Sequence, residues 1–571
     1  MPLKSHSLIL RLTTTLLTLT IALLSQTIAT QTARAQTAPT GTAETTPGTE
    51  THATDNLRQQ ILETMQRATA YMMDSVSYRG GFVWNYLPDR SRQWGEMEAR
   101  PTMAWLQAPG TPQVGHVLLD AYHATGDEGY YEAAERVARA LIWGQLSCGG
   151  WNYVFDFAGE GALQAWYATV GQAGWRLEEF QHYYGNATFD DGVTMDAAKF
   201  LLRLYVEKND PTYRPALEKV INLVLTSQYP SGGWPQRFPL MYDHPFQGQA
   251  DYTSFITLND DVMPDIIEFL TYCYQALGRA DVREPVFRAM YLTIALQQGA
   301  PYAGWADQYT VSDLKPAHAR SYEPRSVNTG TTARMILLML DYFRLTADTR
   351  FLAGIPAALN FLEQSTLPKA EAKKWERPAR DPEAVLMPRF IDPETGQPLY
   401  VHRVGTNVYN GHYFINDKIE GTIGHYSSAA WVNISALRQA YEEAKAEPLA
   451  NLKAQSPLLS EDLTPLPTTF TPLPRDFNNS AENLSETAER LINTLSPDGY
   501  WLTPLRQTSN PYLPLPNDPT LTSTETRYAQ TMVGDEYDTS PFSPSDGQLC
   551  ISTADYINHM RILIECLASS R

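Results

Sequence analysis

The sequence predicts an all-α fold, an α/α toroid in which helical hairpins surround an axis and long loops carry the function. Apolar residues recur at i, i+3, i+4, i+7 and i+8 in 134–142 and 217–225, which is the spacing of an amphipathic helix. Convincing long strands are absent. Helix pairs also repeat along the chain, and a long repeat of this kind is typical of hairpins packed side by side. An open α-solenoid and two separate helical domains are the alternatives.

The periodic segments place the helices along the whole chain. Besides the two segments above, helices are predicted near 57–74, 113–125, 194–208, 262–278, 284–298, 331–346, 350–364, 428–445, 481–495 and 553–567. Residues 366–388 are charged and contain Pro, which predicts a loop. The range 446–476 is a Pro-rich connector, and 477–571 supplies a final hairpin interrupted by 508–547. We therefore expect a single catalytic domain over 55–571.

The repeat has fixed landmarks in each helix pair. An Asp lies in the short turn between the helices, and a Trp preceded by Gly follows 24 residues later in three of the pairs. The Asp residues are Asp127, Asp210, Asp281 and Asp348, whose numbers differ by 67 to 83, and the Trp residues are Trp151, Trp234 and Trp305. Trp84 and Trp501 resemble terminal copies of the same loop.

The N-terminus has the pattern of a secretory signal. Lys4 and Arg11 precede or begin an apolar, Thr-rich stretch, and Ala33-Arg34-Ala35 is a small-x-small cleavage site. We expect residues 1–35 to be removed after Ala35, 36–54 to be a disordered spacer, and the mature protein to be secreted or periplasmic.

Charge and cysteine content exclude several classes of protein. The formal net charge is −19 and becomes −22 without residues 1–35, so a general nucleic-acid or anionic-membrane binder is not expected. Four cysteines in 571 residues exclude a disulfide scaffold. A Cys550–Cys566 bridge and buried free thiols both remain open. We expect a monomer.

Acidic pairs directly before two helices are the clearest candidates for a site. Asp190-Asp191 precedes the helix that starts near Thr194, and Asn259-Asp260-Asp261 precedes the helix that starts near Val262. Asp and Asn are good N-caps, which is one interpretation. Because the pairs occupy corresponding points of successive repeats, they should face the same end of the toroid, where they could hold Ca²⁺ or act as an acid/base pair.

Aromatic and basic residues on the loops suit an anionic sugar. Trp234 and the other Gly-Trp residues could stack on sugar faces, although buried aromatic residues usually serve packing. Arg320, Arg389 and Arg403 lie in loops, and a guanidinium matches a carboxylate in shape and charge.

With these residues in place, the chain resembles the family 10 polysaccharide lyases, the pectic acid (pectate) lyases. The likeness covers roughly 95–430. It rests on stretches that appear in family order: 105–115, 149–153, 187–192, 227–236, 256–261 and the segment Lys315-Pro-Ala-His-Ala-Arg320.

The resemblance implies a Ca²⁺-assisted β-elimination on polygalacturonate or pectic oligosaccharides, giving a 4,5-unsaturated product. It makes Arg320, Asp190 and Asp260 the catalytic residues, with Arg320 as the proton acceptor or as a charge stabiliser. The implied metal ligands are Asp190, Asp191, Asp260 and Asp261, and the implied substrate contacts are Arg389, Arg403, Trp234, Lys315 and Asn259. Departures from the family pattern occur around Arg389 and Arg403, where the family has other residues beside the arginines.

Two other functions remain open on the same residues. An inverting glycoside hydrolase would use Asp190 and Asp260 as acid and base. A non-catalytic uronate-binding protein would bind the polymer without shortening it.

Overall fold

The structure is a computed structural model that describes residues 48–171, 178–241, 251–373, 375, 379–404, 412–422, 428–459, 484–505 and 548–569. The predicted signal over 1–35, the range 508–547 and most of the connector over 446–476 lie outside the described residues. Helix α2 (Gly48–Tyr71) begins inside the range predicted as a spacer. Among the described residues, no helix is both long and apolar enough to span a membrane.

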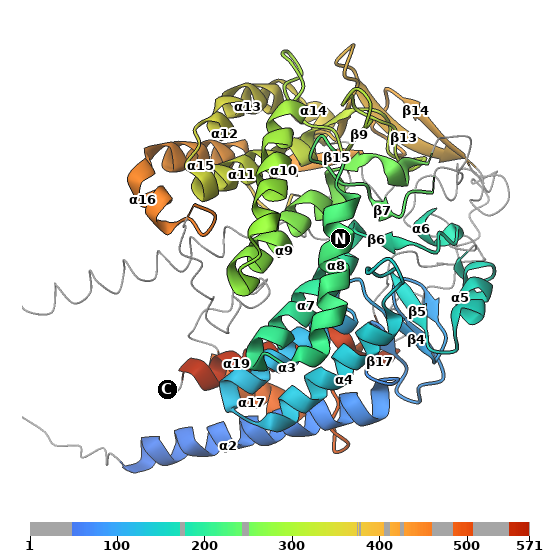
Figure 1. Ribbon diagram of the computed structural model, residues 1–571, viewed down its shortest axis with the longest axis vertical. Helices are drawn as coiled ribbons and strands as arrows, with labels where there is room; N and C mark the ends of the chain where they lie inside the picture. The colour runs from blue at the N-terminus through green and yellow to red at the C-terminus, as the bar shows by residue number, and fades with distance from the viewer. Residues whose placement is uncertain are drawn as a thin grey trace, which may run out of the picture.

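Helical hairpins packed side by side build the molecule, so the predicted α/α class is confirmed. The long helices after α2 are α3 (Thr111–Thr125), α4 (Glu128–Gly144), α7 (Val193–Lys208), α8 (Arg214–Ser227), α9 (Val262–Leu277), α10 (Arg283–Leu296), α11 (Thr329–Thr346), α13 (Ile355–Gln364), α15 (Ile434–Ala446), α17 (Leu484–Thr494) and α19 (Thr553–Ser569). Helix α3 contacts α4, α7 and α19, helix α7 contacts α9, and helix α11 contacts α13 and α15. In Figure 1 these helices form one continuous body that runs from α2 and α19 at the bottom to α13 and α15 at the top.

Asp side chains begin the second helix of three hairpins. Asp127 accepts a hydrogen bond from the Gly129 amide, and Asp348 accepts one from the Arg350 amide. Asp210 does the same for Thr212. These bonds satisfy amides that have no partner within a helix, which explains the recurring Asp in the sequence. Asp281 instead forms an ion pair with Arg279, so this turn uses a different contact.

Each Gly-Trp loop is fixed to the strand that leads into the next hairpin. The carbonyls of Trp151, Trp234 and Trp305 accept hydrogen bonds from the amides of Thr188, Thr257 and Asn328 in turn. At the N-terminus the equivalent carbonyl belongs to Phe82, which accepts from Trp105, so Trp84 is not the repeat residue that the sequence suggested.

The two ends of the described chain lie together. The Trp84 carbonyl accepts a hydrogen bond from the Thr553 amide, and strand β17 (Leu549–Ser552) pairs with β1 (Asn85–Tyr86). Helix α19 packs on both α2 and α3. The C-terminal hairpin therefore packs directly against the N-terminal one.

Short strands gather among the loops on one side of the helices (Figure 1). Four pairs or sheets lie here: β4 (Met103–Trp105) with β5 (Val154–Asp156), β6 (Ala187–Thr188) with β7 (Arg237–Phe238), β8 (Ile256–Thr257) with β9 (Gln308–Tyr309), and β10 (Val327–Asn328), β12 (Phe390–Ile391), β13 (Pro398–Val404) and β14 (His412–Asn416) in one sheet. Strand β1 also pairs with β2 (Gln93–Trp94), which pairs with β3 (Glu98–Ala99).

Two sequence expectations are wrong in this region. Arg403 lies in strand β13 and not in a loop, because Tyr400 to Val404 pair with β14. Residues 429–432 form strand β15 and not the start of a helix, because they pair with β11 (Val385–Pro388). Helix α15 begins only after Asn433, whose side chain accepts from the Ala436 amide.

The cysteines are free thiols. Cys273, Cys550 and Cys566 are buried and Cys148 is partly buried, and none is in a disulfide. Of the two expectations for Cys550 and Cys566, the buried free thiols are confirmed and the bridge is wrong.

Candidate active site

A single guanidinium lies among four carboxylates where the loops of three hairpins meet. Arg320, in the loop between β9 and β10, is 1% exposed. Its Nη2 lies 2.7 Å from Asp190 Oδ2, and its Nη1 lies 3.6 Å from Asp260 Oδ2 and 3.3 Å from Glu323 Oε1. Its Nε lies 3.5 Å from Glu179 Oε2. We call these five residues the Arg320 cage.

Two similar turns place Asp190 and Asp260 in the cage from neighbouring positions, since Asp190 corresponds to Asn259 in the repeat and Asp191 corresponds to Asp260. Each lies in a 3-10 turn between a two-residue strand and a long helix: 190–192 lies between β6 and α7, and 259–261 lies between β8 and α9. Asp191 and Asp260 both have φ of 52°, a left-handed conformation that Asp and Asn adopt more readily than most residues. The two turns contact each other, as the repeat predicted.

N-capping does not explain these acidic residues. Gly192 and Asp261 hold the N-cap positions of α7 and α9, and neither helix has a side-chain cap hydrogen bond. Asp190 and Asp260 bind Arg320 instead. The geometry therefore favours a site over a purely structural use of both motifs.

Burial changes the protonation of the cage. It raises the pKa of Asp190 and of Glu179, although the Arg320 charge opposes both shifts. Burial also raises the pKa of Glu323 to about 7, again against the effect of Arg320. Carboxyl groups that titrate this close to neutral pH are suited to accept and release protons.

Tyr153 adds a donor to the cage. Its hydroxyl group donates a hydrogen bond to Asp190 Oδ2, and its ring packs on Phe180, 5.1 Å away between centroids. Tyr153 follows Trp151 by two residues, in a loop that the repeat identified.

The sequence did not single out Tyr153, Glu179 or Glu323. Tyr153 lies within the quoted stretch 149–153, and Glu323 follows the quoted Arg320 by three residues. Glu179 has no such signal, because helix α6 (Glu178–Gln181) brings it to the cage from another part of the chain.

The remaining predicted ligands of the acidic motifs surround the cage. Asn259 donates from Nδ2 to Asp260 Oδ2 at 2.7 Å. Asp191 accepts a hydrogen bond from Gln107 Nε2 at 2.5 Å. Burial raises the pKa of Asp261 to about 6, and the Arg334 charge opposes this shift.

The donor set fits a hard cation only in part. Asp190 Oδ1 and Asn259 Oδ1 are buried and have no hydrogen-bond partner among the described residues. Carboxylate and amide oxygens are the ligands that Ca²⁺ prefers. In the described part of the chain, however, no three or more His, Cys, Asp or Glu side chains group as a metal site. The described residues therefore offer two unpartnered oxygen atoms to a cation and not a complete set of ligands.

The structure does not support a sugar-stacking role for Trp234. The residue is 0% exposed, and its indole Nε1 donates to the Val224 carbonyl in the preceding helix at 2.8 Å. Trp151 bonds to Leu141, Trp305 to Thr293 and Trp501 to Leu491 in the same way. The Gly-Trp loops are anchors that hold each hairpin together.

The basic residues outside the cage are placed as follows. Lys315 is exposed and lies 3.0 Å from Asp313. Arg389 is bonded through its backbone to Ser428 and to Thr329, the first residue of α11. Arg403 lies in β13 opposite Tyr413, and its side chain is outside the described part of the structure. The substrate-binding roles of these three residues stay predictions.

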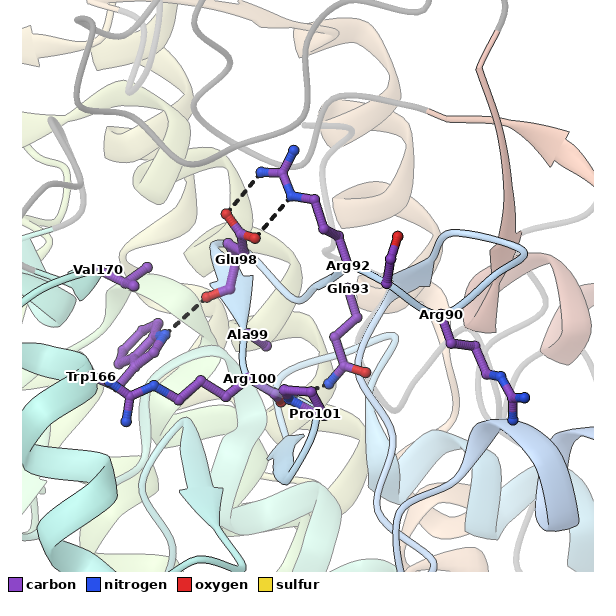
Figure 2. Close-up of a pocket in the computed structure, with 10 residues that line it drawn as sticks. Arg90, Arg92, Gln93, Glu98, Ala99, Arg100, Pro101, Trp166 and Val170 are labelled. Carbon is purple, nitrogen blue, oxygen red and sulfur yellow. Dashed lines mark hydrogen bonds and ion pairs between the residues drawn. The ribbon is translucent and has the colours of Figure 1, made fainter.

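A pocket of about 210 Å³ lies beside strands β2 and β3 (Figure 2). Arg90, Arg92 and Arg100 line it together with Glu98 and Trp166, and Arg92 is ion-paired with Glu98 at 2.8 Å. The guanidinium groups of Arg90 and Arg100 point in different directions in Figure 2, and no residue of the Arg320 cage lines the pocket.

Comparison with known proteins supports a polysaccharide lyase. Residues 164–422 match the family model described as pectic acid lyase, and this range contains Asp190, Asp260 and Arg320. The resemblance to the family 10 polysaccharide lyases is thereby confirmed over that segment. No curated protein matches the chain.

Solved structures show only a distant likeness. A family 10 polysaccharide lyase from Cellvibrio cellulosa has 17% identity and a TM-score of 0.35, and the match covers 52% of this chain and 87% of that one. A mutant of that lyase in complex with trigalacturonic acid has 17% identity and a TM-score of 0.38, over 59% and 98% of the two chains. A cellobiose 2-epimerase from Spirochaeta thermophila has 12% identity and a TM-score of 0.32, over 70% and 99%. These values carry no weight for the function.

Proposed function

We propose that the protein is a pectate lyase that cleaves polygalacturonate by β-elimination at the Arg320 cage. The observation that supports this most is the contact of Arg320 with both Asp190 and Asp260, inside the segment that matches the pectic acid lyases. Asp260 is the more accessible of the two carboxylates, with 24% of its side chain exposed against 1% for Asp190. We therefore expect the substrate to approach from the Asp260 side.

The reaction requires stabilisation of negative charge next to a group that is already negative. Removal of the C5 proton of a galacturonate unit builds charge on its C6 carboxylate, and the C4–O bond then breaks without water. A fixed positive charge beside that carboxylate lowers the barrier. Arg320 can supply such a charge, because four carboxylates fix the position of its guanidinium.

The surroundings of Arg320 bear on its two predicted roles. A base must be neutral, whereas carboxylates within about 4 Å favour the charged form of a guanidinium. The cage therefore supports Arg320 as a charge stabiliser, with the proton passing to another group. In this role Arg320→Lys should keep measurable activity while Arg320→Ala loses it. Equal loss in both variants, with the two folded, would favour Arg320 as the base.

A hydrolase is less consistent with the cage. An inverting glycosidase needs a water molecule between carboxyl groups that are about 6.5–9.5 Å apart. Here the Arg320 guanidinium bonds to Asp190 and lies within ion-pair distance of Asp260, so both carboxylates are engaged by a cation. The products distinguish the reactions, because only the lyase gives a 4,5-unsaturated end that absorbs ultraviolet light.

Calcium would be held by Asp260 and Asp190 together with the amide oxygen of Asn259 and oxygens of the substrate. When bound it would supply positive charge to the substrate carboxylate. Treatment with a chelator should then abolish the release of unsaturated product, and added Ca²⁺ should restore it. Activity that is unchanged by chelation would contradict the cation.

Export belongs to the proposal as well. A pectic polymer is too large to cross a membrane unaided, so an exported enzyme reaches it directly. N-terminal sequencing of the mature protein should find Gln36 as the first residue, as the Ala33-Arg34-Ala35 pattern predicts.

A further inference from the structure

Three aromatic rings and an arginine form a cluster on the surface, outside the Arg320 cage. Trp143, near the end of α4, is 48% exposed, and Tyr78 is 38% exposed. The Phe157 ring lies between them, 4.6 Å from the Trp143 ring and 5.5 Å from the Tyr78 ring. The guanidinium carbon of Arg79 lies 5.9 Å from the Tyr78 ring centre and 5.7 Å from that of Phe157.

The exposure of Trp143 contrasts with the repeat tryptophans. Trp151, Trp234 and Trp305 are at most 1% exposed and donate their indole N–H groups inside the fold. Trp143 has the largest exposed fraction of the large apolar side chains described. An apolar patch of this kind marks a contact with another molecule more often than a single exposed residue does.

A tight turn holds Arg79 against the rings. Tyr78 and Gly81 exchange both backbone hydrogen bonds, and Arg79 and Gly80 between them have φ of 54° and 89°. This is a two-residue hairpin turn of the primed type, in which Asn or Gly is usual at the first position. Gly80 has no room for a side chain, since a Cβ would lie 2.3 Å from the Arg136 carbonyl oxygen.

Charge and position indicate what the cluster binds. Arg139 is one helical turn before Trp143 on the same face of α4, and 62% of its side chain is exposed. Its Nη1 lies 4.0 Å from Glu135 Oε2, a surface ion pair of the kind that contributes little and that a carboxylate ligand can replace. Phe157 follows strand β5, and Tyr153 of the active site precedes that strand. Four residues of extended chain span about 13 Å, so the cluster is a short distance from the cage.

We propose that this cluster is a second binding surface for the anionic polysaccharide, which holds the polymer beside the active site. Sugar faces stack on Trp143 and Tyr78, and uronate carboxylates bind Arg79 and Arg139. The proposal rests on the proposed function for the identity of the polymer. The rings supply affinity for sugars and the arginines supply selectivity for acidic ones.

Binding and cleavage by three variants test the surface. Trp143→Ala removes the most exposed ring, and Arg79→Asn removes the charge while placing a residue that the turn favours, so loss of folding is not expected. Arg90→Asn is the matched control, because Arg90 is also an exposed arginine at positive φ (59°) but is not part of the cluster. Affinity for polygalacturonate is measured by electrophoresis in gels that contain the polymer, with a neutral polysaccharide as a second gel.

The expected result is a loss of affinity confined to the cluster. Trp143→Ala and Arg79→Asn should each weaken binding of polygalacturonate about fivefold, in line with the loss of one ring or cation contact. Their kcat/KM should fall on the polymer and stay unchanged on trigalacturonate, and Arg90→Asn should behave as the wild type.

Several results would overturn the surface. These are equal polymer binding by all variants, equal weakening in Arg90→Asn, or a concentration-dependent dimer that Trp143→Ala abolishes. If polygalacturonate binding depends on Trp143 but no unsaturated product forms, the binding surface stands and the lyase reaction fails. If the product forms and Trp143→Ala cleaves and binds like the wild type, the surface alone fails.

Discussion

The hydrogen bond between Tyr153 and Asp190 can be tested by removing one oxygen atom, the Tyr153 hydroxyl. The Tyr153 hydroxyl group is the donor to Asp190 Oδ2, and this hydrogen bond lowers the Asp190 pKa against the larger effect of burial. A hydrogen bond to an ionised group stabilises it by about 1.5–3 kcal/mol, which corresponds to one to two pH units.

Tyr153→Phe should therefore move the acid limb of the pH profile upward. The phenylalanine keeps the ring packing on Phe180 but leaves Asp190 with one donor fewer, so Asp190 is protonated at a higher pH. We expect the acid limb of kcat/KM to shift up by about one pH unit. A profile that keeps its acid limb in Tyr153→Phe would show that Asp190 does not have to be ionised.

Protonation of Glu323 makes the free energy of unfolding depend on pH. Its pKa rises from 4.5 to about 7 on folding, so between these values the folded protein binds more protons than the unfolded chain. This group therefore lowers the free energy of unfolding as the pH rises from about 4.5 to about 7, and the loss is complete above pH 7.

Glu323→Gln should remove that part of the pH dependence. Glutamine can still accept from the Arg320 amide, as Glu323 Oε2 does at 3.1 Å. The variant should gain stability relative to the wild type when both are moved from pH 5 to pH 8, as followed by urea unfolding. The same change in the exposed Glu394, which pairs with Arg325, should leave the difference unaltered. Parallel pH curves for wild type and Glu323→Gln would contradict the assignment.

At the scale of elements, the Gly-Trp loop joins a helix to the next hairpin by hydrogen bonds. Gly232 has φ of 110°, and a Cβ there would lie 2.7 Å from the Arg288 carbonyl oxygen. The sequence predicted this loop and its period, because Gly and Trp are visible at fixed spacing. It did not settle whether the indole points inward, because the pattern also suits a sugar platform, although aromatic residues of this kind usually serve packing.

Trp234→Phe distinguishes the two uses of this residue. As an anchor it should lower the free energy of unfolding by about 2–3 kcal/mol, through the lost hydrogen bond to Val224 and the smaller ring. The KM of the folded variant should stay unchanged. A higher KM without loss of stability would instead favour contact with the sugar.

On the scale of the whole molecule, the last hairpin packs against the first one. Helix α19 contacts α2 and α3, and Leu563 of α19 is fully buried in the main core. The helix positions were predictable from periodicity, but this union of 553–569 with the N-terminal hairpin was not, because no local pattern encodes a contact over 450 residues. The same limit applies to Glu179, which reaches Arg320 only through the fold.

Leu563→Ala should therefore destabilise the entire domain. We expect a loss of about 2–5 kcal/mol and one cooperative transition, seen alike by tryptophan fluorescence, helical circular dichroism and enzyme activity. Leu337→Ala is the control, since Leu337 is 40% exposed on α11 and should change stability little. Activity that survives beyond an early transition would show that the C-terminal hairpin is a separate unit.

The reaction itself is the central claim, and ultraviolet absorbance of the products tests it most directly. Polygalacturonate is incubated with the wild type and with Arg320→Ala in the presence of Ca²⁺, and absorbance is read together with reducing ends. The account predicts that absorbance and reducing ends rise together in the wild type and that neither rises in Arg320→Ala. Reducing ends that appear without absorbance would contradict it, because they would show hydrolysis and not β-elimination.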